Sequence, residues 1–100
     1  MSSILQWREP PEDMLRVLIR VGLLPTGTMP TCTVNRVILR AVVTFNGLQV
    51  EGGGPCEYTH PSPAARKPSG AASANGWHVW RLPDGRRLDD LRQQYRRGEY

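Results

Sequence analysis

The sequence has few of the features that mark secreted, membrane-spanning and metal-dependent proteins. Only two cysteines, Cys32 and Cys56, occur in 100 residues, which is too few for a disulfide framework and favours a reducing compartment. No apolar run approaches the roughly 20 residues that a membrane-spanning helix needs, and the N-terminus lacks a charged segment followed by an apolar one. We therefore expect a soluble protein without membrane contact, in the cytoplasm or on the nucleoid.

Acidic residues are absent from the middle of the chain. No Asp or Glu occurs between Glu57 and Asp84, whereas Arg66, Lys67 and Arg81 fall in this stretch together with both histidines. The formal net charge of the whole chain is +4, so the expected partner of this stretch is an anion. The lack of clustered carboxylates also argues against metal-assisted cleavage of phosphodiesters, because carboxylates usually hold the metal ion in such enzymes.

Other signals of catalysis or metal binding are weak. Cys32, Cys56, His60 and His78 are potential zinc ligands, but their spacing differs from that of zinc fingers and zinc ribbons. No Ser or Cys stands in a local pattern that would supply a base and an orienting carboxylate. We expect no metal, no other cofactor and no enzymatic activity.

The length and composition fit one small domain. One hundred residues, of which 39% are hydrophobic and 22% charged, are enough for a single modest core. Residues 1–9 show no periodicity and are expected to form a flexible N-terminus. The domain is therefore assigned to residues 10–98.

Two helices are expected near the ends of this domain. Apolar residues repeat at i, i+3, i+4 and i+7 within Met14–Val21, after a proline pair at residues 10–11, which predicts an N-terminal helix that stops at Gly22. The apolar stripe within Leu88–Tyr95 predicts a C-terminal helix that stops at Gly98.

A short central helix is expected between them. Pro61 suits a first helical turn, and Thr59 or His60 can cap it. Because Pro68 is difficult to accommodate inside a helix, we expect this helix to end by Lys67.

A β-hairpin is predicted over Val37–Val50. Asn46 and Gly47 form the pair that most strongly favours a tight hairpin turn. A two-residue loop at this pair would place Phe45 opposite Leu48, on the buried face of the ribbon.

Two further strands are predicted, at Cys56–Tyr58 and at Trp77–Leu82. In a strand, Trp77 and Trp80 would point to opposite faces, so we expect one ring in the core and the other at the surface. The predicted fold class is α+β, a small antiparallel sheet packed with an N-terminal, a short central and a C-terminal helix.

The stretch from Tyr58 to Trp80, YTHPSPAARKPSGAASANGWHVW, carries an ordered pattern of small and aromatic residues. It resembles the RAMA domain, the restriction enzyme adenine methylase associated module, in which Tyr-(Ser/Thr)-x-Pro-Ser-x-Ala-Ala is followed, after a glycine, by Asn-Gly-Trp-x-(aromatic or apolar)-Trp. The matching positions are Tyr58, Thr59, Pro61, Ser62, Ala64, Ala65, Gly70, Asn75, Gly76, Trp77 and Trp80. Leu18–Thr28 and Leu82–Arg92 resemble the opening and closing segments of the same family.

The resemblance implies a module that recognises modified duplex DNA and accompanies a restriction nuclease or a methylase. The base that it reads could be N6-methyladenine or 5-methylcytosine, and the residues do not choose between them. The rival interpretation is a protein-interaction module without direct DNA contact, which docks another polypeptide through an apolar strand face or an exposed tryptophan.

Phosphate binding is expected where the central helix begins. The free backbone N–H groups of its first turn and the Ser62 hydroxyl can hold a phosphate, and Arg66 and Lys67 add charge one turn later. Alternatively, Ser62 satisfies only its own helix end. The residues assigned to DNA backbone binding are Ser62, Arg66, Lys67, Arg81, Arg86 and Arg87.

Base recognition is expected around the Asn-Gly-Trp segment. The Asn75 amide fits the N6 and N7 edge of adenine, and N6-methyladenine still has one N–H to donate. An Asn-Gly pair can also be a simple turn with positive φ, and both interpretations stay open. A tryptophan outside the core could stack on an extruded base. The residues assigned to the modified base are Tyr58, Asn75, Trp77, His78 and Trp80.

Overall fold

The computed structural model describes residues 13–100, so the segment 1–9 and the expected helix start at residues 10–11 lie outside the described residues. The described chain is α+β, as predicted, with a four-stranded antiparallel sheet in the order β1-β2-β3-β4. In chain order the elements are α1 (Met14–Arg20), β1 (Thr31–Val34), β2 (Val37–Val43), β3 (Leu48–Val50), β4 (Glu57–Tyr58), α2 (Pro61–Ser69), α3 (Gly76–Val79) and α4 (Leu88–Arg96).

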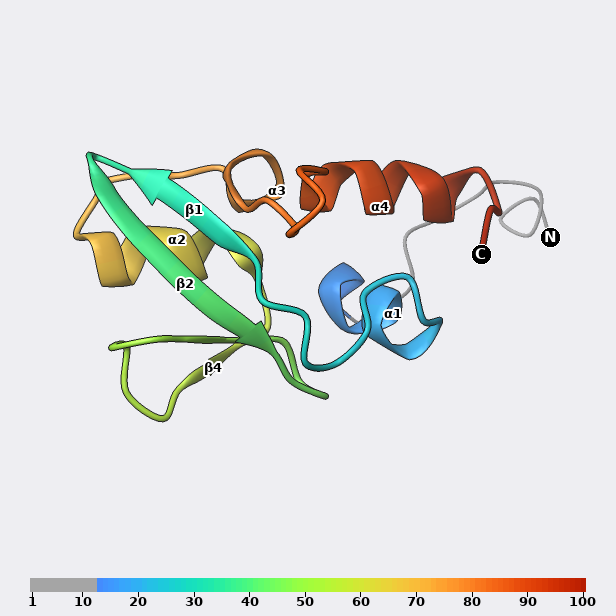
Figure 1. Cartoon of the computed structure of the whole chain (residues 1–100), viewed down its shortest axis with the longest axis horizontal. Helices are drawn as coiled ribbons and strands as arrows, with labels where there is room; N and C mark the ends of the chain where they lie inside the picture. The colour runs from blue at the N-terminus through green and yellow to red at the C-terminus, as the bar shows by residue number, and fades with distance from the viewer. Residues whose placement is uncertain (1–12) are drawn as a thin grey trace, which may run out of the picture.

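The elements separate into a sheet half and a helical half. Figure 1 shows α2 against one face of the sheet, with α1 and α4 together beyond the end of the strands and α3 between the sheet and α4. The helices α1 and α4 end where the sequence predicts, because Gly22 (φ 88°) and Gly98 (φ 74°) follow them in the left-handed region that favours glycine.

The predicted hairpin forms, but with a wider turn. Val43 pairs with Leu48, so Thr44–Gly47 make a four-residue connection, and Phe45 is 82% exposed instead of facing Leu48. The Thr44 hydroxyl explains the wider turn, because its oxygen accepts hydrogen bonds from the backbone N–H groups of Asn46 and Gly47, each at 3.2 Å. The two-residue loop predicted at Asn46-Gly47 is therefore wrong.

The tight hairpin lies one strand earlier, between β1 and β2. Val34 pairs with Val37, and the two loop residues Asn35 and Arg36 have φ of 50° and 67°. Two successive positive φ angles are the geometry whose twist matches that of paired strands. The sequence gives a weak signal here because an arginine takes the position that glycine usually occupies.

The segment predicted as the strand Trp77–Leu82 is instead the helical turn α3 followed by an extended end, a correction to the expected fold. The Asn75 carbonyl accepts the N–H of Val79 at 3.0 Å, and the Gly76 carbonyl accepts that of Trp80 at 3.2 Å. Strand pairing survives only at Arg81, whose N–H and carbonyl both bond to Thr31, at 2.7 and 2.9 Å.

The cause of this turn is the close approach of Gly76 to the start of α2. A Cβ on Gly76 would lie 2.1 Å from both the carbonyl carbon and the oxygen of Pro61, and the Gly76 N–H donates to the Ser62 hydroxyl oxygen at 2.9 Å. The chain therefore bends around the start of α2 and cannot continue as a straight strand from Trp77.

The central helix is longer than predicted, since it passes Pro68 and ends at Ser69. The Ser69 hydroxyl donates toward the carbonyls of Ala65 (2.7 Å) and Arg66 (3.1 Å), which adds a donor to the last turn, where Pro68 has no backbone N–H. Gly70, with φ 75°, then closes the helix. The N-cap residue is His60, whose side chain makes no capping hydrogen bond.

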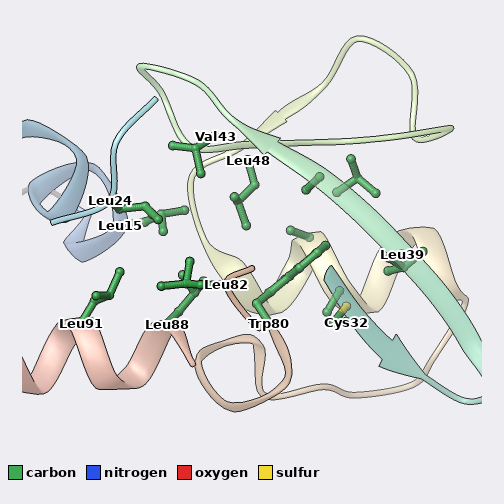
Figure 2. Packing of buried hydrophobic residues seen from close by; sticks show 14 of the residues in the cluster. Leu15, Leu24, Cys32, Leu39, Val43, Leu48, Trp80, Leu82, Leu88 and Leu91 are labelled. Carbon is green, nitrogen blue, oxygen red and sulfur yellow. The ribbon is translucent and has the colours of Figure 1, made fainter. Parts of the chain in front are cut away.

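One continuous core joins the two halves. Alternate residues of the strands face α2, and the core extends through Trp80 and Leu82 to the leucines of α1 and α4 (Figure 2). Trp80 is fully buried, and its indole N–H donates to the Pro61 carbonyl at 3.0 Å. The buried ring therefore fixes α3 to the start of α2 and positions the surface that α3 carries.

Candidate nucleic-acid interface

Helix α3 and the chain up to the second turn of α4 bring aromatic and basic side chains to one surface. Trp77 is half-buried, and the guanidinium carbon of Arg92 lies 4.4 Å from the centre of its ring. His78 is exposed, with Nδ1 3.4 Å from Nη1 of Arg87. We call this region the α3–α4 surface and define it by Trp77, His78, Arg81, Arg87 and Arg92.

Asp89 holds Arg92 in place over Trp77. The Arg92 Nε and Nη2 groups donate to the same Asp89 oxygen, at 3.0 and 2.5 Å, and both side chains are largely buried. Burial acts to raise the pKa of Asp89, but the hydrogen bond and charge of Arg92, with the charge of nearby His78, outweigh it and lower the pKa. Asp89 therefore stays ionised and keeps the arginine stacked on the ring.

Arg87 is fixed at the beginning of α4. Its backbone N–H donates to the Asp90 carboxylate at 2.8 Å, which caps the helix. Because an arginine can only donate, Nδ1 of His78 is the acceptor in this contact whenever the imidazole is neutral.

Two more arginines, Arg81 and Arg86, flank the turn at residues 83–85. Arg81 forms an isolated bridge with Arg87 and donates from Nη1 to the Gly85 carbonyl at 3.1 Å. Arg86 bonds Asp84 through its backbone N–H at 3.0 Å and through Nε at 2.8 Å, and these bonds lower the pKa of the Asp84 carboxyl. Arg81 and Arg87 therefore lie together, whereas Arg86 lines a separate hollow with Pro25 and Leu82.

A hollow of about 340 Å³ opens between β1 and α3, beside the α3–α4 surface. It is lined by Thr31, Cys32, Thr33, His78, Val79 and Arg81. Burial raises the pKa of the Cys32 thiol to about 11, so the sulfur is uncharged at neutral pH. The hollow is thus lined by the hydroxyls of two threonines, one imidazole and one guanidinium, together with the uncharged thiol of Cys32.

The start of α2 is less open than the sequence suggests. The Ser62 hydroxyl is used by Gly76, and a Cβ on Gly76 would lie 2.4 Å from the Ser62 backbone nitrogen, so Gly76 covers this amide. Ser62 therefore links α2 to α3, which corrects the expectation that its hydroxyl and amide face a phosphate. Arg66 and Lys67 lie in the last turn of the helix, where positive charge is favoured, and neither has an ion pair with another described residue.

The residues assigned to the modified base do not all reach the same surface. Trp80 is 0% exposed and offers no face to a base, which corrects that assignment. Tyr58 lies half-buried on β4, at the opposite edge of the sheet from β1, which α3 contacts. Trp77 and His78 are exposed at least in part on α3.

Asn75 precedes these two residues as the N-cap of α3. It is exposed, its side chain makes no capping hydrogen bond, and its φ is −97°. Neither Asn75 nor Gly76 is among the residues with positive φ, so the pair opens a helical turn and does not form the positive-φ turn.

Sequence reasoning missed the pairing of Arg92 with Trp77 and the role of Asp89. The spacing of Asp89 and Arg92 at i and i+3 indicates an ion pair on one helix face. That this pair lies over Trp77 depends on how α3 meets α4, and no local pattern carries that information.

Two findings concern other kinds of site. Within residues 13–100, no group of three or more His, Cys, Asp and Glu side chains could hold a metal ion. His60, one of the potential zinc ligands in the sequence, lies 3.3 Å from the Asp13 carboxylate. Across that same part of the chain, no helix has the length and apolar character that crossing a membrane requires.

Comparison with protein families gives one match that spans most of the chain. The family model described as Restriction Enzyme Adenine Methylase Associated, abbreviated RAMA, matches residues 8–100. No curated protein and no solved structure matches the chain.

Proposed function

The chain belongs to the RAMA family, and on this premise we propose that it binds duplex DNA and recognises a modified base. The family description associates such domains with restriction enzymes and adenine methylases. The protein would then act as the reading module for a nuclease or methylase partner and carry no catalytic residue itself.

The observation that carries this proposal is the arrangement of the α3–α4 surface. A partly exposed tryptophan lies under Arg92, and the next residue, His78, contacts Arg87. Arginines contact phosphates and base edges, and an aromatic ring contacts a base or its methyl group. The combination suits DNA better than it suits an uncharged ligand.

In this proposal the arginines hold the DNA backbone. Arg81 and Arg87 neighbour each other across an isolated bridge, so they can contact phosphates of the same strand segment, and Arg86 adds a contact only if the DNA also reaches the hollow at Pro25 and Leu82. The ion pair of Arg86 with Asp84 is about half exposed on both sides, and such pairs contribute little, so a phosphate can replace the carboxylate. Arg66 and Lys67 on α2 would contribute additional, weaker contacts.

Base recognition falls to Asn75, Trp77 and His78. The Asn75 amide is free to meet the N6 and N7 edge of adenine, and His78 lines the hollow beside β1. Trp77 can pack against a methyl group on N6-methyladenine or 5-methylcytosine. Tyr58 can take part only if the DNA also reaches the β4 edge of the sheet.

The test compares duplexes that are identical except for one modification. Fluorescence anisotropy would measure binding to unmodified, N6-methyladenine and 5-methylcytosine duplexes at a fixed salt concentration. One modified duplex should bind more tightly than the unmodified one, and Asn75→Ala or Trp77→Ala should remove most of this preference while leaving binding to unmodified DNA within about threefold.

A matched control uses an arginine outside the α3–α4 surface. Arg36→Gln changes an exposed residue at the tip of the β1–β2 hairpin and should leave the preference intact. The proposal fails if modified and unmodified duplexes bind equally well to the wild-type protein, or if both α3 variants keep the full preference.

A further inference from the structure

The sheet has a second face that no described helix covers. Alternate residues of the first three strands point away from α2, and Figure 1 shows this side of the sheet open. We call it the outer sheet face and define it by Thr31, Thr33, Ile38, Arg40, Val42 and Gln49. It faces away from the core that α2 closes.

This face carries exposed apolar side chains beside a groove. Ile38 is 65% exposed, and Met29, on the segment that leads into β1, is also 65% exposed. A groove of about 580 Å³ runs over the face, with Met29, Val42 and Gln49 among the residues that line it. Apolar side chains gathered around a groove are typical of a surface that binds a partner.

The charges on the face identify the kind of partner. Arg40 and Glu51 both line the groove and neighbour each other across β2 and β3, where the Glu51 N–H donates to the Arg40 carbonyl at 2.8 Å. Their side chains are exposed, and neither forms an ion pair with another described residue. A carboxylate in the groove repels phosphates, so the face suits a polypeptide with charges of both signs better than it suits DNA.

We infer that the outer sheet face binds a second copy of this chain across a two-fold axis. In a two-fold contact the same surface patch lies on both sides, so each Arg40 can meet the Glu51 of the other copy. The side chains of Ile38, Val42 and Met29 then lose contact with water between the two sheets. The inference does not depend on the proposed function, because the Arg40–Glu51 pair lies on β2 and directly after β3, away from α3 and α4; within the described part of the chain the two surfaces meet only at Thr31 and Thr33 of β1.

A charge-exchange experiment on the full chain tests this arrangement. Sedimentation equilibrium of the wild-type protein over a range of concentrations should show a reversible monomer–dimer equilibrium. Arg40→Glu sets two carboxylates against each other in the dimer, and Glu51→Arg sets two guanidiniums against each other. Each variant should therefore weaken self-association by about tenfold or more.

Mixing the two variants should restore the dimer. In the mixed pair every carboxylate at position 40 or 51 meets an arginine of the other chain, and native mass spectrometry separates this heterodimer from both homodimers by mass. Lys67→Glu makes the same change of charge on α2, which lies against the opposite face of the sheet, and should leave dimerisation unchanged.

Circular dichroism provides the check that all three variants are folded, since the exchanged side chains are exposed. A wild-type chain that stays monomeric at every concentration would overturn the inference. A variant mixture that stays monomeric would overturn it too, as would an Arg40→Glu variant that dimerises like the wild type but loses DNA binding, which would assign the face to nucleic acid.

Discussion

Position 76 requires a glycine because there is no room for a side chain, and not because of the backbone conformation, since the φ of Gly76 is not positive. An added Cβ would lie 2.1 Å from the Pro61 carbonyl, which is backbone and cannot move aside alone. Gly76, which together with Asn75 resembles a turn signal in the sequence, is therefore the contact point between α2 and α3. The sequence identifies the glycine correctly, but the reason for it is visible only when the two helices are placed together.

We predict that Gly76→Ala destabilises the fold by about 2–4 kcal/mol, because it forces α3 away from the start of α2. Chemical denaturation followed by circular dichroism measures the loss. Gly53→Ala is the control, since Gly53 also lacks a positive φ and its Cβ would approach the Val50 carbonyl only to 3.2 Å. Equal losses in both variants would contradict this account of Gly76.

The Asp89–Arg92 pair should make stability depend on pH. The pKa of Asp89 is lowered in the folded state, so its contribution is present above the pKa of an unfolded aspartate and is lost as the pH falls through the folded value. We predict that Asp89→Asn lowers the free energy of unfolding at neutral pH and flattens its fall toward acid pH. Urea denaturation at several pH values measures both effects.

A control variant distinguishes the effect of the Asp89–Arg92 pair on the pH dependence from that of other acidic groups. Glu99→Gln removes a carboxylate that pairs with Arg97, more than half exposed on both sides, and should leave the pH dependence nearly unchanged. An Asp89→Asn profile parallel to that of the wild type would show that Arg92 does not stabilise the Asp89 anion.

At the scale of elements, the strands follow from the sequence better than their connections do. The hairpin of β2 and β3 is predicted from Asn46-Gly47 and the helices α1 and α4 from their apolar stripes, and the α+β class follows from these elements. The tight turn lies between β1 and β2, where the non-glycine pair Asn35-Arg36 forms it. The loop between β2 and β3 is wider than predicted because the Thr44 hydroxyl accepts two of its backbone N–H groups. Such side-chain hydrogen bonds decide the conformation of a loop, but they leave little trace in the sequence pattern.

In the Trp77–Leu82 segment, the prediction of the element itself is wrong. Its aromatic and β-branched residues favour a strand, yet the contact at Gly76 and the burial of Trp80 produce a helical turn. Tertiary packing thus overrides local preference. The identity of the surface tryptophan, Trp77, follows from this packing and was left open by the sequence.

The β1–β2 turn should respond to a residue that prefers positive φ. Arg36 has φ 67°, a conformation that costs an L-residue with a side chain more than it costs glycine. We predict that Arg36→Gly stabilises the protein by about 0.5–1 kcal/mol. Thermal denaturation measures the gain, and Arg40→Gly, inside β2, should instead destabilise. A loss of stability in Arg36→Gly would contradict the strain assigned to this turn.

At the scale of the whole molecule, the proposed DNA contact and the proposed self-association use different charged residues, on surfaces that adjoin at Thr31 and Thr33 of β1. The α3–α4 surface carries arginines near Trp77, whereas the outer sheet face carries exposed apolar residues with one charge of each sign. The two interactions should therefore respond differently to salt.

We predict that DNA affinity falls steeply with salt, by about 0.9 logarithmic units per tenfold change in salt for each phosphate contact. Anisotropy titrations from low to physiological ionic strength give this slope. The double variant Arg81→Gln with Arg87→Gln should reduce it by about two contacts. A slope that is unchanged in the double variant would mean that these arginines do not touch the DNA backbone.

The hydrogen bond between the Trp80 indole and the Pro61 carbonyl has a practical consequence for spectroscopy. It withholds this indole proton from solvent, while the ring of Trp77 stays partly in contact with water. The two tryptophans, three positions apart, thus act as independent probes of one short segment. The Trp80 signal reports whether the interior is intact, and the Trp77 signal reports whether something has settled on the exterior.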